Sequence, residues 1–169
     1  MLTSVSAELV KECVTHLQES TKRVAVCLQL LTEEELWQKP NAQANSIANL
    51  ILHLCGNMTQ YILSSLGAIP DVRERDKEFT TKGGLSKTDL LKKLSVTVTD
   101  VIKVLEKQTD DSLLHIKTVQ GFSKSGASII IHVTEHFSYH CGQIALLTKL
   151  MTNTDLDFYK GINLNAKNK

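Results

Sequence analysis

The stretch at residues 125–152 reads SGASIIIHVTEHFSYHCGQIALLTKLMT and carries three histidines spaced four residues apart, His132, His136 and His140. If this apolar segment is an α-helix, each step of four residues turns the chain by about 400° and rises about 6 Å. The three side chains then form one column. Two neighbouring members of such a column can bind one metal ion, as in other His-x-x-x-His pairs on helices.

The pair alone has a second interpretation, because such histidines can also be core residues that hydrogen-bond a carbonyl or a hydroxyl. A further histidine in another segment favours the metal-binding interpretation. His53 lies in SIANLILHLCGNMTQYI, residues 46–62, a second apolar segment whose inner face a helical bundle can bring opposite the column. Two ligands from one helix and one from another make three, the usual count where one coordination position stays open for water or substrate.

Length and charge limit the classes of protein to consider. The chain has 169 residues, enough for one domain with a substantial core and short for two. Its 19 basic and 18 acidic residues give a net charge of +1, with no basic run that could follow a phosphate backbone. We therefore expect no nucleic-acid partner.

Cysteine usage and hydropathy indicate a reduced, cytoplasmic chain. No Cys-x-x-Cys pair occurs, and the N-terminus MLTSVSAELVKEC has no secretory leader. No apolar run reaches the roughly 18 residues that a membrane span needs, so we expect no membrane partner. The four cysteines lie far apart, at Cys13, Cys27, Cys55 and Cys141.

Apolar residues recur at helical spacing in four segments. They predict an all-α domain with four long helices near residues 3–31, 46–66, 86–108 and 126–152. Thr3 or Ser4 can cap the first helix and Ser46 the second, while Ser86 and Asp89 form a capping-box pattern at the third. Part of the third segment, SVTVTDVIKV, also has strand propensity, but its apolar spacing favours a helix.

The connections between these segments are unequal. Residues 67–85 could extend about 60 Å, enough to carry the chain back along the bundle, so we expect the second and third helices to run parallel. We interpret RERDKE, residues 73–78, as a solvated loop rather than a binding patch. Residues 110–124 suggest a short extended segment or an irregular hairpin across the end of the bundle. Residues 153–169 form a polar tail that can dock through Leu156, Phe158 and Tyr159.

Helix levels predict which histidines meet. In an up-down-down-up bundle the second and fourth helices are antiparallel, so residues early in one lie level with residues late in the other. His53 lies roughly 10 Å into its helix, whereas His140, His136 and His132 lie roughly 18, 24 and 30 Å from Thr152. His140 and His136 are nearest to His53 in level, and His132 is expected to be an onlooker.

The segments NSIANLILHLCGN (45–57) and HVTEHFSYHCGQIALL (132–147) resemble the DinB family of four-helix-bundle proteins, and the order of segments fits over nearly the whole chain. The resemblance implies one up-down-down-up bundle domain over residues 1–169, often dimeric. It also implies a divalent metal held by one histidine of the second helix and a His-x-x-x-His pair of the fourth, which match His53, His136 and His140. The family name refers to DNA-damage induction and implies no DNA binding.

The function that this resemblance implies is metal-dependent chemistry on a small molecule. Family activities include transfer onto low-molecular-weight thiols and isomerisation with such thiols, and many members are called hydrolases without a demonstrated substrate. Imidazole ligation suits zinc, nickel, iron or copper and does not choose among them. We expect a metal-dependent enzyme of the thiol S-transferase or hydrolase type; the alternative is a non-catalytic metal-binding or structural bundle.

No general acid or base can be assigned from sequence. Each ligating histidine needs an outer partner that fixes its tautomer. The polar residues nearest to the ligands in sequence are Asn57, Tyr61, Glu135 and Tyr139. Cys55 and Cys141 are expected to face away from the metal and to pack as small residues.

Overall fold

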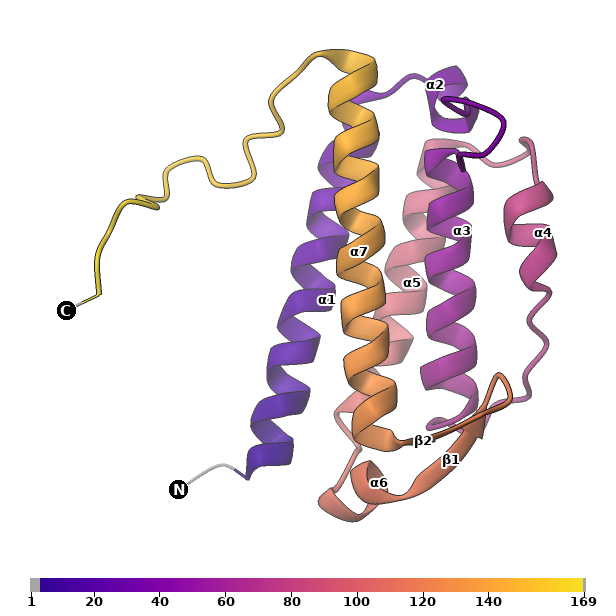
Figure 1. Cartoon of the computed structure of the whole chain (residues 1–169), viewed down its shortest axis with the longest axis vertical. Coiled ribbons are helices and arrows are strands. Elements are labelled where there is room, and N and C mark those ends of the chain that lie inside the picture. The colour runs from indigo at the N-terminus through magenta and orange to yellow at the C-terminus, as the bar shows by residue number, and fades with distance from the viewer. Residues whose placement is uncertain (1–3, 169) are drawn as a thin grey trace.

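Four long helices lie side by side in the structure, a computed structural model that describes residues 4–168 (Figure 1). Two of them, α1 and α7, point upward in Figure 1, whereas α3 and α5 point downward and are therefore parallel to each other. The long connection between α3 and α5 is what allows this direction. The four helices are α1 (Val5–Leu30), α3 (Ile47–Met58), α5 (Lys87–Leu105) and α7 (Gly126–Thr152).

The connections contain short elements. Three are helices: α2 (Glu33–Trp37), α4 (Arg75–Thr80) and α6 (Asp110–Leu114). Two are strands, β1 (Ile116–Val119) and β2 (Phe122–Ser125), which pair antiparallel as a hairpin. The expectation of an all-α chain therefore needs a correction: the protein is mostly helical and carries one small two-stranded sheet.

Each long helix begins at a residue whose side chain caps its first turn. A serine hydroxyl accepts a hydrogen bond from the backbone N–H three residues later at Ser4, Ser46, Ser86 and Ser125. The capping box of Ser86 and Asp89 is present as predicted. Thr3, the other candidate for the first cap, lies outside the described residues.

The apolar faces of the long helices meet in one core. Helix α1 packs against α5 and α7, and α3 packs against the same two helices. The largest fully buried side chains come from all four helices and include Leu17, Leu54, Leu94 and Phe137. Among the described residues, no helix combines the length and apolarity needed to cross a membrane.

The second long helix departs from the prediction at its C-terminal end. Regular α-helix ends at Met58, and residues Thr59–Ser64 form a π-helical turn, η1. Such turns are uncommon and occur frequently at functional sites. Tyr61, within this turn, lines the cavity described below.

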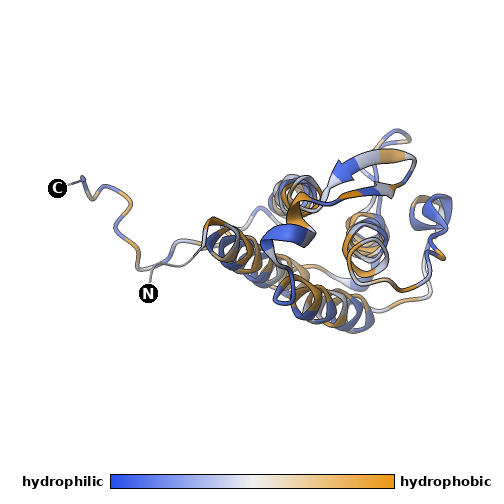
Figure 2. Cartoon of the chain, turned by 90° about the horizontal axis from the view of Figure 1, so that it is seen from below, coloured by the Kyte–Doolittle hydropathy of each residue, from blue (hydrophilic) through white to orange (hydrophobic). Residues whose placement is uncertain are grey.

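The segment between α5 and α7 covers one end of the helices (Figure 2). The hairpin prediction is confirmed, whereas helix α6 was not anticipated. Gln120 and Gly121 connect the strands and have φ values of 51° and 80°. Two successive left-handed residues give the twist that a two-residue hairpin needs, which favours glycine at the second position.

The C-terminal tail leaves the body of the protein in Figure 1 after a short docked portion. Leu156 is buried and Phe158 packs against the core, as the sequence predicts. The Arg23 guanidinium lies 5.7 Å from the ring centroid of Phe158 and 5.5 Å from that of Tyr159. These cation–π contacts attach the start of the tail to α1.

Leu94→Ala should lower the free energy of unfolding by about 2–5 kcal/mol, because a fully buried leucine leaves a cavity when truncated. The same change at Leu150, which is 72% exposed, should cost less than about 0.5 kcal/mol. Urea denaturation monitored by circular dichroism measures both. Equal losses for the two variants would contradict the assignment of the core.

Candidate metal centre

Three histidines from two helices bring one ring nitrogen each to a common point. The Nε2 atom of His136 lies 3.0 Å from Nε2 of His53 and 3.2 Å from Nε2 of His140. His53 belongs to α3 and the other two to α7. One ligand atom from each of the three lies within 4.8 Å of the other two. His53 is buried and the α7 pair is partly buried.

These separations fit a metal site. Zinc–nitrogen bonds of about 2.0–2.1 Å in a tetrahedral arrangement place two ligand nitrogens roughly 3.3 Å apart. The observed Nε2 separations of 3.0 and 3.2 Å are close to that value. Three converging imidazoles leave room in the coordination shell for a further ligand. The residues present therefore fit a divalent ion held by His53, His136 and His140.

Glu78 fixes the orientation of His53. Its Oε2 lies 2.8 Å from His53 Nδ1, and both side chains are almost fully buried. Because an ionised carboxylate can only accept, His53 must carry its proton on Nδ1 and donate it to Glu78. The lone pair of Nε2 is then free to bind a metal. Carboxylate partners of this kind are typical of ligating histidines.

Arg73 holds Glu78 in place. Its Nε donates to Glu78 Oε1 at 2.8 Å and its Nη2 donates to Glu78 Oε2 at 2.9 Å, while Nη1 reaches Gln60 Oε1 at 2.8 Å. The arginine side chain is 3% exposed. Two parallel N–H···O bonds between a guanidinium and a carboxylate give both strength and a fixed geometry. Arg73 therefore restrains the carboxylate that orients His53.

The two histidines of α7 differ in their outer partners. His140 Nδ1 lies 2.7 Å from Gln143 Oε1, which accepts its proton and leaves Nε2 free. His136 Nδ1 is buried and has no hydrogen-bond partner among the described residues. The outer contacts therefore fix the tautomers of His53 and His140, whereas His136 is positioned by packing.

Burial keeps the α7 histidines neutral. It lowers the pKa of His136 to about 3, with a further contribution from the neighbouring imidazoles, and it also lowers the pKa of His140. Burial by itself would raise the pKa of Glu78, but hydrogen bonds from Arg73 and His53 outweigh this and hold the pKa below its ordinary value. Neutral imidazoles beside an ionised carboxylate are the protonation states that metal binding needs.

His132, the expected onlooker, lies outside the cluster. Its ring centroid is 5.6 Å from that of His136 and 4.6 Å from that of Tyr61, on which it stacks. Burial and the charge of Lys124 lower the pKa of His132. His132 therefore forms part of the wall beside the three-histidine cluster.

The other polar residues and the cysteines near the histidines in sequence differ in their distance from the cluster. Asn57 and Tyr61 line the cavity next to the cluster, whereas Glu135 and Tyr139 are exposed and do not. Cys141 is buried and its thiol donates to the Ser20 carbonyl. Cys141 therefore faces away from the metal-facing nitrogens, as expected.

A cavity of about 510 Å³ opens beside the histidines. Residues from α3, η1, the α4 region, the hairpin and α7 line it: His53, Asn57, Tyr61, Arg73, Arg75, Gln120, Phe122, His132 and His136. Tyr61 donates a hydrogen bond of 2.8 Å to Gln120 Oε1, which ties η1 to the tip of the hairpin. This volume accommodates a small molecule next to the cluster.

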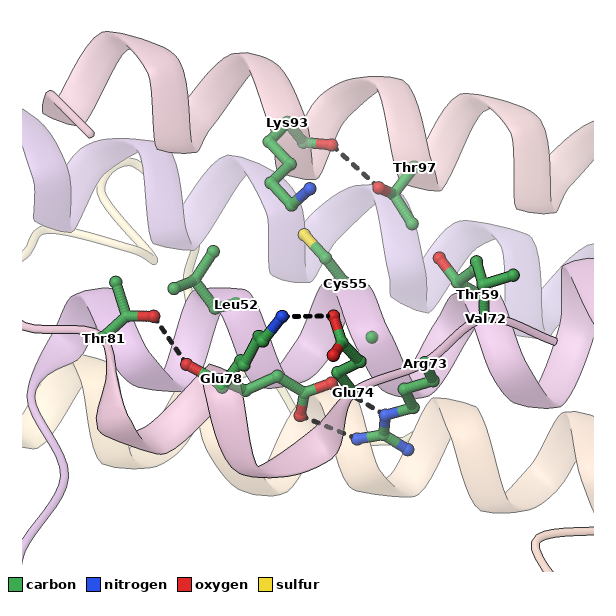
Figure 3. Close-up of a pocket in the computed structure, with 12 residues that line it drawn as sticks. Leu52, Cys55, Thr59, Val72, Arg73, Glu74, Glu78, Thr81, Lys93 and Thr97 are labelled. Carbon is green, nitrogen blue, oxygen red and sulfur yellow. Dashed lines mark hydrogen bonds and ion pairs between the residues drawn. The ribbon is translucent and has the colours of Figure 1, made fainter. Parts of the chain in front are cut away.

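A second cavity, about 300 Å³, shares Arg73 with the first (Figure 3). In Figure 3 the Arg73 guanidinium faces the Glu78 carboxylate, and Cys55 lies beneath helix α5 near Lys93. Burial raises the pKa of the Cys55 thiol to about 11, so this thiol is protonated and unreactive at neutral pH. The metal-facing nitrogens do not line this second cavity.

The interpretation of RERDKE as a solvated loop is wrong, because helix α4 begins at Arg75 and two of the six side chains are buried. Arg73, just before α4, and Glu78, within α4, turn their side chains inward. Asn49 anchors this helix by donating to the carbonyls of Glu78 and Thr81 at 2.9 and 2.8 Å. Nothing local in the sequence marks Glu78 as the partner of a histidine 25 residues earlier. Gln143 could have been found, since three residues after His140 places it on the same helix face.

Gly56→Ala should weaken metal affinity about ten- to a hundredfold, the usual cost of disturbing an outer partner. A Cβ atom at this position would lie 1.8 Å from Glu78 Oε1 and 3.0 Å from Arg73 Nε, so the carboxylate must move. Gly142→Ala is the matched control, because its Cβ meets nothing within 4 Å. Competition with a chromophoric chelator measures both affinities, and equal values for the two variants would contradict the role of Glu78.

The metal-free protein should lose stability as the pH falls from about 6.5 toward 3. The unfolded chain takes up a proton at His136 near pH 6.5, whereas the folded pKa is about 3, so acid favours unfolding within this window. His136→Gln should reduce the difference in free energy of unfolding between pH 7 and pH 4.5. The same substitution at exposed His115 should leave that difference unchanged, and an unchanged difference in both variants would count against the burial of His136 as its cause.

Comparison with known proteins agrees with this architecture. A DinB-like protein from Bacillus cereus is 19% identical with a TM-score of 0.67, covering 83% of this chain and 91% of its own. A conserved protein from Enterococcus faecalis is 14% identical with a TM-score of 0.73, covering 90% and 100%. A DinB-like protein from Bacillus subtilis is 16% identical with a TM-score of 0.64, covering 85% and 94%. At these identities the likeness concerns the fold.

No curated protein matches the sequence. One family does, over residues 4–162, and it is described as "Protein of unknown function (DUF1572)". This match spans both histidine segments and the whole of the helical body. The chain therefore belongs to the DUF1572 family, which has the DinB-like fold.

Proposed function

We propose that this protein is a metal-dependent enzyme of the thiol S-transferase or hydrolase type, acting on a small molecule. The observation that carries the proposal is the convergence of three imidazole Nε2 atoms beside a cavity of about 510 Å³. A structural zinc site usually has four protein ligands, whereas three ligands leave a position for a reactant. In this proposal His53, His136 and His140 hold one divalent first-row metal ion.

The residues of the chain prepare the site for this chemistry. Glu78 and Gln143 orient two of the imidazoles, and burial keeps the α7 pair uncharged. A divalent ion bound by neutral ligands lowers the pKa of a coordinated thiol or water, which makes thiolate or hydroxide available near neutral pH. Tyr61, Gln120 and Phe122 shape the wall along which a substrate would lie.

We propose a topology, an oligomeric state and a location for the protein that fit this role. We interpret the four long helices as an up-down-down-up bundle that forms one domain over residues 1–169. The fold likeness supports this topology, and family resemblance supports a homodimer. We also propose a cytoplasmic location, which the wide spacing of the four cysteines supports. The balanced charge of +1 argues against a nucleic-acid partner, and the interrupted apolar runs argue against a membrane partner.

A non-catalytic metal-binding or structural bundle is the second candidate. One observation favours it: no carboxylate lines the cavity among residues 4–168, so neither Asp nor Glu offers a general base there. A substrate whose acidic proton is lost on metal binding, such as a thiol, requires no separate base. The enzyme proposal therefore favours thiol chemistry over hydrolysis of an inert bond.

Metal content tests the ligand set. Alanine substitution of His53, His136 or His140 should each reduce bound zinc strongly, from about one ion per chain to a small fraction, because two ligands hold an ion far less tightly than three. His132→Ala should keep the stoichiometry of the parent. Metal analysis after identical loading, with circular dichroism as the folding control, gives the answer. Zinc retained at full stoichiometry in the His53 variant would contradict the proposed ligand set.

Turnover tests the enzyme. The metal-loaded protein should couple one or more small thiols to a chlorobimane-type electrophile, and a chelator should abolish this activity. His140→Ala should lower the rate of coupling by at least about a hundredfold if the metal supplies the activated thiol. Absence of turnover over a broad thiol and ester panel, with metal bound at full stoichiometry, would support the non-catalytic candidate.

A further inference from the structure

The cavity beside the histidines has a one-sided charge. Its lining contains two arginines, Arg73 and Arg75, and no carboxylate among the described residues. Neutral imidazoles do not compensate a bound divalent ion, so the metal would add further positive charge. A cavity with this balance favours a negatively charged ligand.

The two arginines have different roles. All three donor nitrogens of the Arg73 guanidinium are engaged by Glu78 and Gln60, and the Glu78 carboxylate neutralises its charge. The Arg75 side chain forms no hydrogen bond or ion pair with the other residues of 4–168. Its charge is therefore the uncompensated one on the cavity wall.

An aromatic ring holds the Arg75 guanidinium close to the histidines. The guanidinium carbon lies 4.9 Å from the centroid of the Phe79 ring, and that ring lies 4.7 Å from the ring of His53. A cation–π contact orients the guanidinium and leaves its edge of N–H donors available. A planar fork of this kind matches the two oxygens of a carboxylate or phosphate.

The remaining wall offers a polar anchor and an apolar surface. Asn57 is buried, and its Oδ1 has no hydrogen-bond partner among the described residues. A buried acceptor without a partner is costly, so a ligand that donates to it gains affinity. Phe122, at the start of β2, is 58% exposed and provides apolar contact area.

We propose that the cavity binds a small organic anion whose carboxylate or phosphate group pairs with the Arg75 guanidinium. The body of the molecule then lies along Phe122, within reach of Asn57 and of the face of the histidine cluster. This inference rests on the proposed function because it names the substrate class of the same site. Arg75 is the residue that selects a charged substrate over a neutral one.

The experiment measures the binding of three probes by calorimetry to zinc-loaded and to metal-free protein. Phenylacetate and phenyl phosphate carry the two candidate anionic groups, and phenylacetamide is the neutral counterpart of the first. Arg75→Gln should weaken binding of the preferred anion about ten- to a hundredfold, the range for a lost charge-assisted hydrogen bond. The binding of phenylacetamide should be weaker than that of phenylacetate and unaffected by the substitution.

Lys77→Gln is the matched control. It removes the same unit of charge from the same helix, but Lys77 is exposed, pairs with Glu74 at 2.7 Å, and lines the other cavity. Its anion affinity should equal that of the parent. Whichever of phenylacetate and phenyl phosphate binds more tightly identifies the anionic group.

Two results would overturn the inference: equal anion affinity in the parent and Arg75→Gln proteins, or phenylacetamide binding as tightly as phenylacetate. Both are separate from failure of the proposed function, which shows as absence of turnover with zinc bound, or as zinc content well below one ion per chain in the parent. In that case the metal-free titrations still decide whether Arg75 binds the anion, because metal is absent from them.

Discussion

A buried hydrogen bond between His53 Nδ1 and Glu78 Oε2, 2.8 Å long, connects the fold of this protein to its chemistry. It joins α3 to the connection between α3 and α5, and it determines which nitrogen of His53 faces the other two histidines. Glu78 remains ionised in a buried position because Arg73 supplies two donors and His53 supplies a third. Gly56 leaves the space that the carboxylate occupies. The long connection is thus a structural part of the site.

The energetics of this pair explain why the connection has a fixed path. Removing one partner of a buried ion pair typically costs about 3–5 kcal/mol, because the other charge is left without compensation in a medium of low polarity. Arg73, Glu78 and His53 must therefore come together in every folded molecule. Asn49 donates two hydrogen bonds, to the carbonyls of Glu78 and Thr81, which fix the backbone at Glu78 and at the C-terminal end of α4. Arg75 belongs to the same short helix as Glu78. Fixing Glu78 therefore also places Arg75 at the cavity wall.

Periodicity and local chemistry in the sequence specify the long helices and the positions of the three histidines. The long helices follow from apolar spacing, and the caps at Ser46 and Ser86 follow from hydroxyl side chains placed just before that spacing begins. The levels of His53, His136 and His140 follow from helix rise. The pairing of Arg73 and Glu78 with His53 was missed, because charged residues in a polar stretch give no local signal of burial. The π-helical turn at Thr59–Ser64 and helix α6 were missed because tertiary packing decides such short elements. The contact between Gln143 and His140 could be predicted, because residues three apart lie on the same face of a helix.

The histidines of α7 have two different positions: His136 and His140 face His53, whereas His132 lines the cavity. A step of four residues turns the helix by about 40° beyond a full circle, so His132 is rotated by about 80° from His140 and lies about 12 Å along the axis. The ring of His53 lies 4.8 Å from that of His136 and 5.0 Å from that of His140, level with this pair. His132 is left one turn further on, where it stacks on Tyr61 and lines the cavity together with His136 but without His140. The accessible side of the cluster therefore faces His132, toward the hairpin and Arg75.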